Sequence, residues 1–159
     1  MSHRFLLDGM LGSLARWLRI IGYDTLYYVD KEDEELRNEA SKTLRILVTR
    51  DTELYQRAIK NGGVNAIKIT SDTAIDQLKE IAQTLNLQLL PSNTRCPRCN
   101  GILTSVGKET VKEQIPKESY KAFEKFWICA DCNSIYWKGS HWAQIMETLL
   151  KITYVSKCL

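Results

Sequence analysis

The sequence of 159 residues has no hydrophobic run approaching the roughly 18 residues that a membrane-spanning helix needs. Its first residues, Met1 to Phe5, lack the charged head and apolar core of a secretion signal. Proline and glycine are scarce, with 3 and 8 residues, and 44% of the residues are hydrophobic, which excludes a fibrous or disordered chain. We therefore expect a soluble, cytoplasmic protein of one domain, or of one domain with a small appendage.

Several catalytic chemistries lack the side chains they need. The first 91 residues contain no cysteine, no glycine-rich nucleotide-binding loop and no GxSxG motif. The two histidines, His3 and His141, lie at the amino terminus and in the second part of the chain. Nucleophilic and histidine-based mechanisms are therefore disfavoured, whereas carboxylates are abundant.

Excess positive charge is confined to the second part of the chain. The net charge of +3 is by itself too small to indicate a nucleic-acid partner. Residues 1–91 carry 12 basic and 13 acidic side chains (net −1), whereas residues 92–159 carry 10 and 6 (net +4). The composition changes at Pro91-Ser92-Asn93-Thr94, and we place a domain boundary there, between 1–91 and 92–159.

The first part alternates between short apolar or β-branched runs and segments of helical periodicity. Strands are expected at 4–7, 25–29, 45–49 and 66–69, and helices at 11–22, 34–43, 54–61 and 73–85. This order predicts an α/β fold in which helices cover both faces of a parallel sheet. Sites in such folds form at the carboxyl ends of the strands.

Acidic residues stand at the expected ends of these strands. Asp8 follows the first strand, Asp51 follows the third, and the cluster Asp30–Glu35 follows the second. Converging carboxylates repel one another unless a cation binds, and Mg²⁺ or Mn²⁺ would satisfy them and activate water for phosphodiester attack. The alternative is that these acids cap or begin the following helices, with Asp33 as the cap of a helix that starts at Glu34.

The cysteines predict a metal site in the second part. Five cysteines, an odd number, disfavour a disulfide framework. Four of them form two CxxC knuckles, which can bind one structural Zn²⁺ tetrahedrally: Cys96, Cys99, Cys129 and Cys132. A redox-active pair or simply buried thiols are the alternatives.

The 29 residues between the two knuckles are expected to form a hairpin arm with a short helix over Pro116 to Lys125. Cys158 is expected to be a free thiol. His141 is expected to pack against Trp142 or to contact RNA, rather than to replace a zinc ligand.

Three blocks of the sequence carry a family resemblance. The segment Phe5 to Asp24 contains a strand-end Asp followed by an LxxLARWLRxxGxD helix. Residues 33–36 with 45–51 form a second and third block, and CPxCN, the second CxxC and residues 137–141 form the last. Together they resemble the Mut-seven C-terminal RNase family, over nearly the whole chain to about residue 150.

The resemblance implies a PIN-like three-layer α/β/α sandwich, a zinc ribbon and metal-dependent cleavage of RNA. Asp8, Asp33 and Asp51 match the acidic metal-site positions of the family, and Asp72 is a candidate fourth member. In that site Asp8 and Asp51 would bind the metal, and Asp33 would bind it or orient the attacking water.

Basic side chains are candidate RNA contacts. Arg16, Arg19 and Arg50 can hold a phosphate and stabilise developing charge, or can pair with Asp8 or Asp24. The ribbon lysines can follow an RNA backbone beside aromatic residues, or can form a solvated basic face: Lys108, Lys112, Lys121, Lys125 and Lys138.

We therefore predict a ribonuclease that uses Mg²⁺ or Mn²⁺ to hydrolyse RNA, such as tRNA or rRNA, and a zinc ribbon that helps to hold it. A catalytically silent adaptor that binds RNA or the ribosome is the alternative, and a toxin-type nuclease is a further one.

Overall fold

The computed structural model describes residues 3–60 and 63–157. The first part alternates between strands and helices, as expected from its periodicity. Its elements are β1 (Arg4–Leu7), α1 (Gly12–Ile21), β2 (Asp24–Tyr27), α2 (Asp33–Lys42), β3 (Ile46–Thr49), α3 (Thr52–Lys60), β4 (Ala66–Lys68) and α4 (Ala74–Leu85).

The four strands form one parallel sheet in the order β2-β1-β3-β4. Leu7 of β1 pairs with Tyr27 of β2 on one side and with Val48 of β3 on the other. The chain moves from β1 to β2 in one direction across the sheet, and then from β3 to β4 in the opposite direction. The strand order therefore reverses between β1 and β3, which is where α/β sheets open a crevice for ligands.

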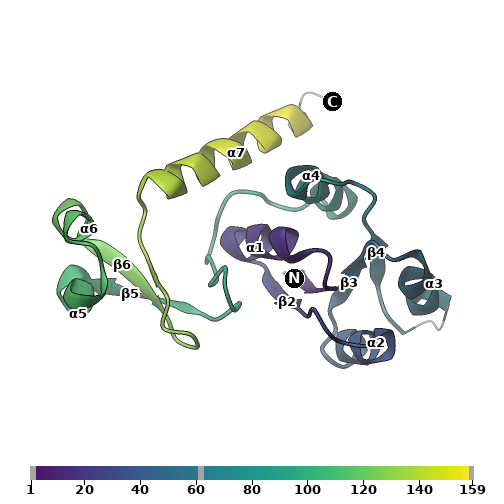
Figure 1. Ribbon diagram of the computed structural model, residues 1–159. Helices are drawn as coiled ribbons and strands as arrows, with labels where there is room; N and C mark the ends of the chain where they lie inside the picture. The colour runs from purple at the N-terminus through teal and green to yellow at the C-terminus, as the bar shows by residue number, and fades with distance from the viewer. Residues whose placement is uncertain (1–2, 61–62, 158–159) are drawn as a thin grey trace.

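Successive residues of the strands point to opposite faces, and each face is covered by helices. Phe5 and Leu7 lie in a core shared with α1 and α4, whereas Leu6 and Leu47 lie in a core shared with α2 and α3. Figure 1 shows the sheet between these two pairs of helices. The expected three-layer α/β/α arrangement is confirmed.

Gly22 ends α1 in the left-handed region, with φ of 119°, which side chains other than glycine rarely adopt. A Cβ atom there would also lie 1.8 Å from the carbonyl oxygen of Ser92. The glycine thus permits the chain that leaves α4 to pass against the end of α1.

The second part contains a three-stranded antiparallel sheet, β5-β6-β7. Its elements are β5 (Leu103–Gly107), α5 (Lys108–Val111), the 3-10 turn η1 (Lys112–Gln114), α6 (Lys117–Ala122), β6 (Lys125–Cys129) and β7 (Ile135–Tyr136). The expected hairpin with a short helix is present. The helix is shorter than predicted because it begins after Pro116 and because Lys125 already belongs to β6.

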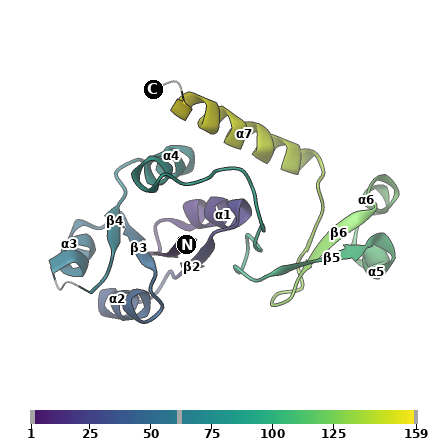
Figure 2. The ribbon, with the colours of Figure 1, turned by 180° about the vertical axis from the view of Figure 1, so that it is seen from behind.

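A long helix that the sequence interpretation missed, α7 (Ser140–Lys157), follows the ribbon. Ile145, Leu149 and Ile152 are buried in the same core as α1 and α4. Figures 1 and 2 show α7 leaving the ribbon and lying across these two helices. These residues are four and three positions apart along the chain, a spacing typical of a helix. The sequence alone groups them with the second part, because they follow the cysteines. The division of the chain at residue 91 remains a prediction, with α7 packed onto the first part.

Candidate functional site

The two strand-end acids Asp8 and Asp51 meet at the point where the strand order reverses. Asp8 follows β1 directly, and its amide donates to the carbonyl of Val48 in β3 (3.3 Å). Asp51 follows the end of β3 by two residues, and its amide donates to the hydroxyl of Thr49 (2.9 Å). Both acids therefore lie at the carboxyl edge of the sheet, as parallel pairing predicts.

Asp8 is buried, with only 7% of the residue exposed. One carboxylate oxygen accepts from the amide of Met10 (3.1 Å), and the other accepts from the hydroxyl of Thr49. No lysine or arginine in the described part of the chain forms an ion pair with it. A buried carboxylate without a cationic partner is costly unless something else compensates its charge.

Asp51 is exposed and performs the capping role that was kept as an alternative. Its Oδ1 accepts from the amide of Leu54 (2.8 Å) in the first turn of α3. Thr49 lies between the two acids, is fully buried, and bonds both of them. Sequence reasoning passed over Thr49, although it stands in the same Thr-Arg-Asp motif as Asp51.

The other two acids of the expected set are bound to arginines. Asp33 pairs with Arg57 (3.3 Å), and the exposed Asp72 pairs with Arg50 (2.6 Å). The alternative in which Asp33 caps α2 is wrong, because α2 already includes Asp33 and the cap is Glu32.

Among residues 3–60 and 63–157, the cysteines form the only group of three or more His, Cys, Asp or Glu side chains close enough to share an ion. The structure thus links Asp8 to Asp51 through Thr49, but does not gather three of the carboxylates into such a group.

The four cysteines of the two knuckles converge as expected. Their sulfur atoms all lie within 4.8 Å of one another, with Cys96 to Cys132 at 3.6 Å and Cys99 to Cys129 at 3.4 Å. Four sulfurs at 2.3 Å from one zinc ion would be about 3.8 Å apart. The cluster therefore fits a tetrahedral zinc site.

Tyr136 supports this cluster from β7. Its hydroxyl lies 3.1 Å from the sulfur of Cys96. Burial raises the pKa of Tyr136, so the phenol stays protonated and can donate to a thiolate. His141 is exposed and is not a member of the sulfur group, and Cys158 lies outside the described residues.

Arg19 does not occupy the position expected of a phosphate contact. It is 5% exposed, and its guanidinium donates to the carbonyls of Thr25 (2.9 Å), Pro97 (3.0 Å) and Arg98 (3.2 Å). Arg19 therefore joins α1 and β2 to the first knuckle, and we leave it out of the proposed RNA contacts.

A second joint connects the knuckle to the sheet. The side chain of Asn100 donates to Asp24 (2.8 Å) and accepts from the amide of Thr25 (2.9 Å). Arg45 pairs with both carboxylate oxygens of Asp24 at 2.9 Å. Burial alone would raise the pKa of Asp24, but the hydrogen bonds from Arg45 and Asn100 outweigh it and hold this pKa well below its usual range.

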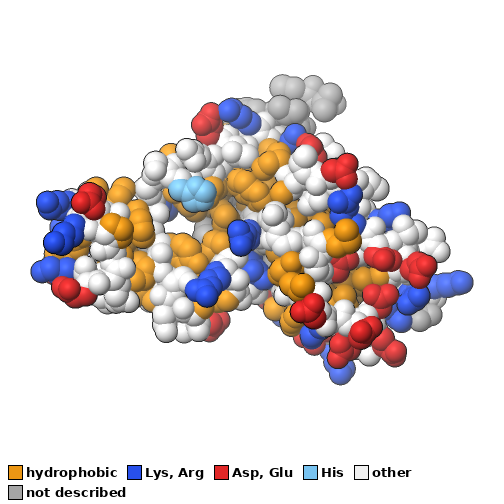
Figure 3. All heavy atoms as spheres, in the orientation of Figure 1, with side chains coloured by type: hydrophobic (Ala, Val, Ile, Leu, Met, Phe, Trp, Pro, Cys, Tyr) orange, Lys and Arg blue, Asp and Glu red, His pale blue; other side chains and the backbone are white. Residues whose placement is uncertain are grey.

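Four of the other candidate RNA contacts are exposed: Arg16 on α1, Lys121 on α6, and Lys125 and Lys138 on the ribbon. The ammonium of Lys125 lies 5.6 Å from the ring centre of Trp127. That of Lys138 lies 5.4 Å from Trp127 and 5.2 Å from Trp142. Figure 3 shows acidic side chains gathered over the end of the molecule formed by α2 and α3, away from the ribbon.

The fold and these sites define an α/β protein with two acidic residues at the carboxyl edge of its parallel sheet and four clustered cysteines that could hold a metal ion. The family model of the Mut7-C RNAse domain matches residues 3–149, so the chain belongs to this family, as its sequence blocks predicted. Membership indicates a nuclease function directed at RNA. Comparisons with curated proteins and with solved structures give no match. No helix in the described ranges combines the length and hydropathy of a membrane span.

Proposed function

We propose that the protein is a metal-dependent ribonuclease that hydrolyses RNA phosphodiester bonds at the sheet edge formed by Asp8 and Asp51. The observation that carries the proposal is the buried carboxylate of Asp8, which has hydrogen-bond donors but no cationic partner among the described residues. It lies beside Asp51 where the strand order reverses, which is the expected place for a ligand.

The oxygen atoms at this edge suit Mg²⁺ or Mn²⁺. Mg²⁺ is commonly held by one or two carboxylates, together with waters and the phosphates of the substrate. Asp8 and Asp51 would supply the two carboxylates, so a complete protein cage is not needed before RNA binds. When bound, the ion supplies an activated water and neutralises charge on the phosphate.

The side chains around this pair have separate roles. Thr49 and the amide of Met10 fix the Asp8 carboxylate before RNA arrives, which reduces the reorganisation that binding requires. Asp33 pairs with Arg57 in this structure, and would bind the ion or orient the attacking water only after leaving that partner. Arg50 pairs with Asp72, which is exposed, and such pairs are weak, so an RNA phosphate can compete for the guanidinium.

The zinc ribbon would hold RNA through its basic side chains, Lys121, Lys125 and Lys138, with Arg16 from α1. The zinc ion itself is structural in this proposal, because four cysteines leave no open coordination position.

The test is cleavage of labelled tRNA and rRNA with Mg²⁺ or Mn²⁺ by the wild type, Asp8→Asn and Asp51→Asn. We expect both variants to lose at least about 100-fold in rate, more than the loss of a residue that only supports a ligand. Glu147→Gln, an exposed carboxylate on α7 outside the acidic edge, is the matched control and should cleave normally.

Manganese binding, measured by calorimetry, gives a second readout, because both site variants should bind the ion more weakly than the Glu147→Gln control. If the wild type binds RNA without cutting it, and binds manganese no better than the variants, the nuclease proposal fails and the adaptor alternative gains support.

A further inference from the structure

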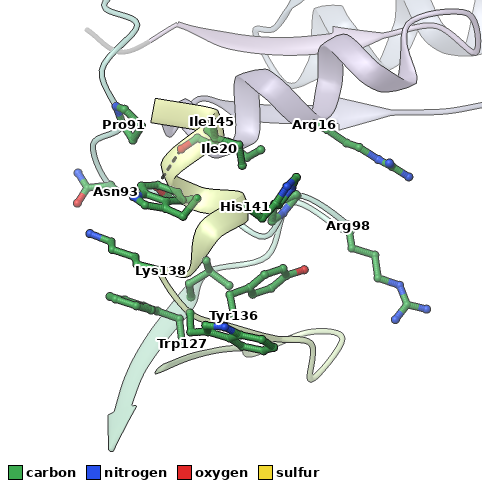
Figure 4. A pocket seen from close by; sticks show the side chains of 15 residues that line it. Arg16, Ile20, Pro91, Asn93, Arg98, Trp127, Tyr136, Lys138, His141 and Ile145 are labelled. Atoms are coloured by element: carbon green, nitrogen blue, oxygen red, sulfur yellow. Dashed lines mark hydrogen bonds between the residues drawn. The ribbon is translucent and has the colours of Figure 1, made fainter. Parts of the chain in front are cut away.

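A cavity of about 870 Å³ lies between the ribbon, α1 and the start of α7. Its volume falls within the range of small-molecule sites, so it can take a nucleotide or two. Figure 4 shows walls contributed by α1, the first knuckle, the ribbon strands and α7. The side chains used below come from each of these walls: Arg16, Arg98, Trp127, Tyr136, Lys138 and Trp142.

The charge of the cavity is of one sign. Arg16, Arg98 and Lys138 line it together with His141, and none of the described lining residues is acidic. None of the three cations forms an ion pair with a carboxylate in the described ranges. Figure 4 shows Arg16 and Arg98 on one side of the cavity and Lys138 on the other. Unpaired cations around a hollow attract a polyanion.

The floor of the cavity is aromatic. Trp127 and Tyr136 are register partners on β6 and β7, so their rings stand on the same face of the ribbon sheet. Tyr136 is anchored at its hydroxyl by Cys96, and Trp142 adds a third ring from α7. The ammonium of Lys138 lies over the rings of Trp127 and Trp142, where it is the only cation within cation–π distance of both among the described residues. Rings beside cations form the usual platform for unpaired bases.

We propose that this cavity binds a single-stranded segment of RNA, with bases on the aromatic rings and phosphates on Arg16, Arg98 and Lys138. The inference rests on the proposed RNA-directed function, and identifies a second place, apart from the carboxylates, where the substrate is bound. Lys138 leaves the ring faces to pair with a phosphate, and a base takes its place. A duplex is excluded because its bases are stacked and cannot enter a recessed site.

The test measures binding of a short fluorescent oligouridine by anisotropy, with every variant made in the Asp8→Asn background to prevent cleavage. Removing the two guanidiniums in Arg16→Gln/Arg98→Gln should weaken binding about 10-fold or more. It should also reduce the slope of log K against log salt by about 1.4, or about 0.7 for each lost phosphate contact. Trp142→Leu should weaken binding about 10-fold through lost stacking.

The charge-matched control is Lys42→Gln/Lys60→Gln, which removes two exposed cations from the ends of α2 and α3. It should change the dissociation constant less than about two-fold. Arg16 and Arg98 are exposed, so their replacement should leave the zinc content and the melting temperature unchanged. Lys138→Gln provides an independent variant if the double substitution fails to fold.

The proposal is overturned if the cavity variants and the control bind the oligouridine with equal affinity. It is also overturned if duplex RNA competes for binding as well as single-stranded RNA does. A cavity that serves a protein partner instead would give this same unchanged RNA affinity. The failure of each proposal gives a different result. If the cavity variants bind RNA more weakly but the wild type does not cleave it, the nuclease proposal is wrong and the cavity proposal stands. If cleavage depends on Asp8 but the cavity variants bind RNA as tightly as the control, only the cavity proposal is wrong.

Discussion

The hydroxyl of Thr49 donates a hydrogen bond to the carboxylate of Asp8 across the pair of strands β1 and β3. The same hydroxyl accepts from the amide of Asp51. One buried side chain thus fixes the position of one strand-end acid and the backbone of the other. The two acidic residues are thus linked through a side chain that carries no charge.

Replacing Thr49 by valine keeps the branched shape and removes the hydroxyl. We expect Thr49→Val to reduce RNA cleavage by about 10- to 100-fold, because partners that orient metal-binding side chains typically contribute this much. Thr49→Ser keeps the donor and should retain most of the activity. Cleavage rates of the two variants at equal protein concentration check the prediction, and a fully active valine variant contradicts it.

The cysteine cluster should bind about one zinc ion per chain. Cys132→Ser should lose most of the bound zinc, whereas Cys158→Ser, which removes the cysteine outside both knuckles, should retain it. Zinc contributes on the order of 10 kcal/mol in such modules, so chelation should unfold the ribbon. The sheet should persist at a lower melting temperature, because Arg19 and Asp24 lose their hydrogen-bond partners in the first knuckle. Atomic absorption measures the bound zinc, and circular dichroism measures the melting curve. A melting curve that is unchanged after chelation contradicts the prediction.

The ion pair of Asp24 and Arg45 should make stability depend on pH in the acid range. The pKa of Asp24 lies below its unfolded value of about 3.9, so its contribution is present above that pH and is lost as the pH falls toward the folded pKa. Asp24→Asn should cost about 2 kcal/mol of unfolding free energy at neutral pH.

Urea unfolding of the wild type and of Asp24→Asn, at neutral pH and at about pH 3, measures the effect. The difference in unfolding free energy between the two proteins should shrink in acid, because the Asp24 carboxylate becomes protonated. The zinc cluster is common to both proteins, so its loss in acid largely cancels in this difference. A difference that stays constant or grows in acid contradicts the assignment.

Two neighbouring leucines test the docking of α7. Leu149 is fully buried in the core shared with α1 and α4, whereas Leu150 is 39% exposed. Leu149→Ala should lower the free energy of unfolding by about 3 kcal/mol, and Leu150→Ala by less than about 0.5 kcal/mol. Urea unfolding of the two variants distinguishes them, and equal effects would mean that α7 is not part of this core.

The periodicity of the sequence was sufficient to predict every strand and helix of the first part, within a few residues at the ends. Local spacing decides which face of a strand or helix is apolar. Gly22 predicts the end of α1, because glycine readily adopts the left-handed backbone conformation of a C-cap. The helix α7 was missed because its apolar spacing belongs to a segment that follows the cysteines, and only the core it joins reveals its role.

The candidate site divides in the same way. The positions of Asp8 and Asp51 follow from strand order, and the convergence of the four cysteines follows from two short turns. The burial of Arg19 under the knuckle could not be predicted, because the sequence shows only a second arginine on the same helix as Arg16. The sequence therefore favours an RNA contact that the structure does not support.

By itself, the sequence determined the parallel α/β sheet, the two CxxC knuckles and the membership of the family, because these depend on local spacing and on strand order. Only the tertiary structure decided which charges are compensated. Asp33 and Asp72 face arginines from other elements, whereas Asp8 is buried with Thr49 and no cation among the described residues. It also decided that three separate segments enclose one basic, aromatic cavity, since that requires contacts far apart along the chain.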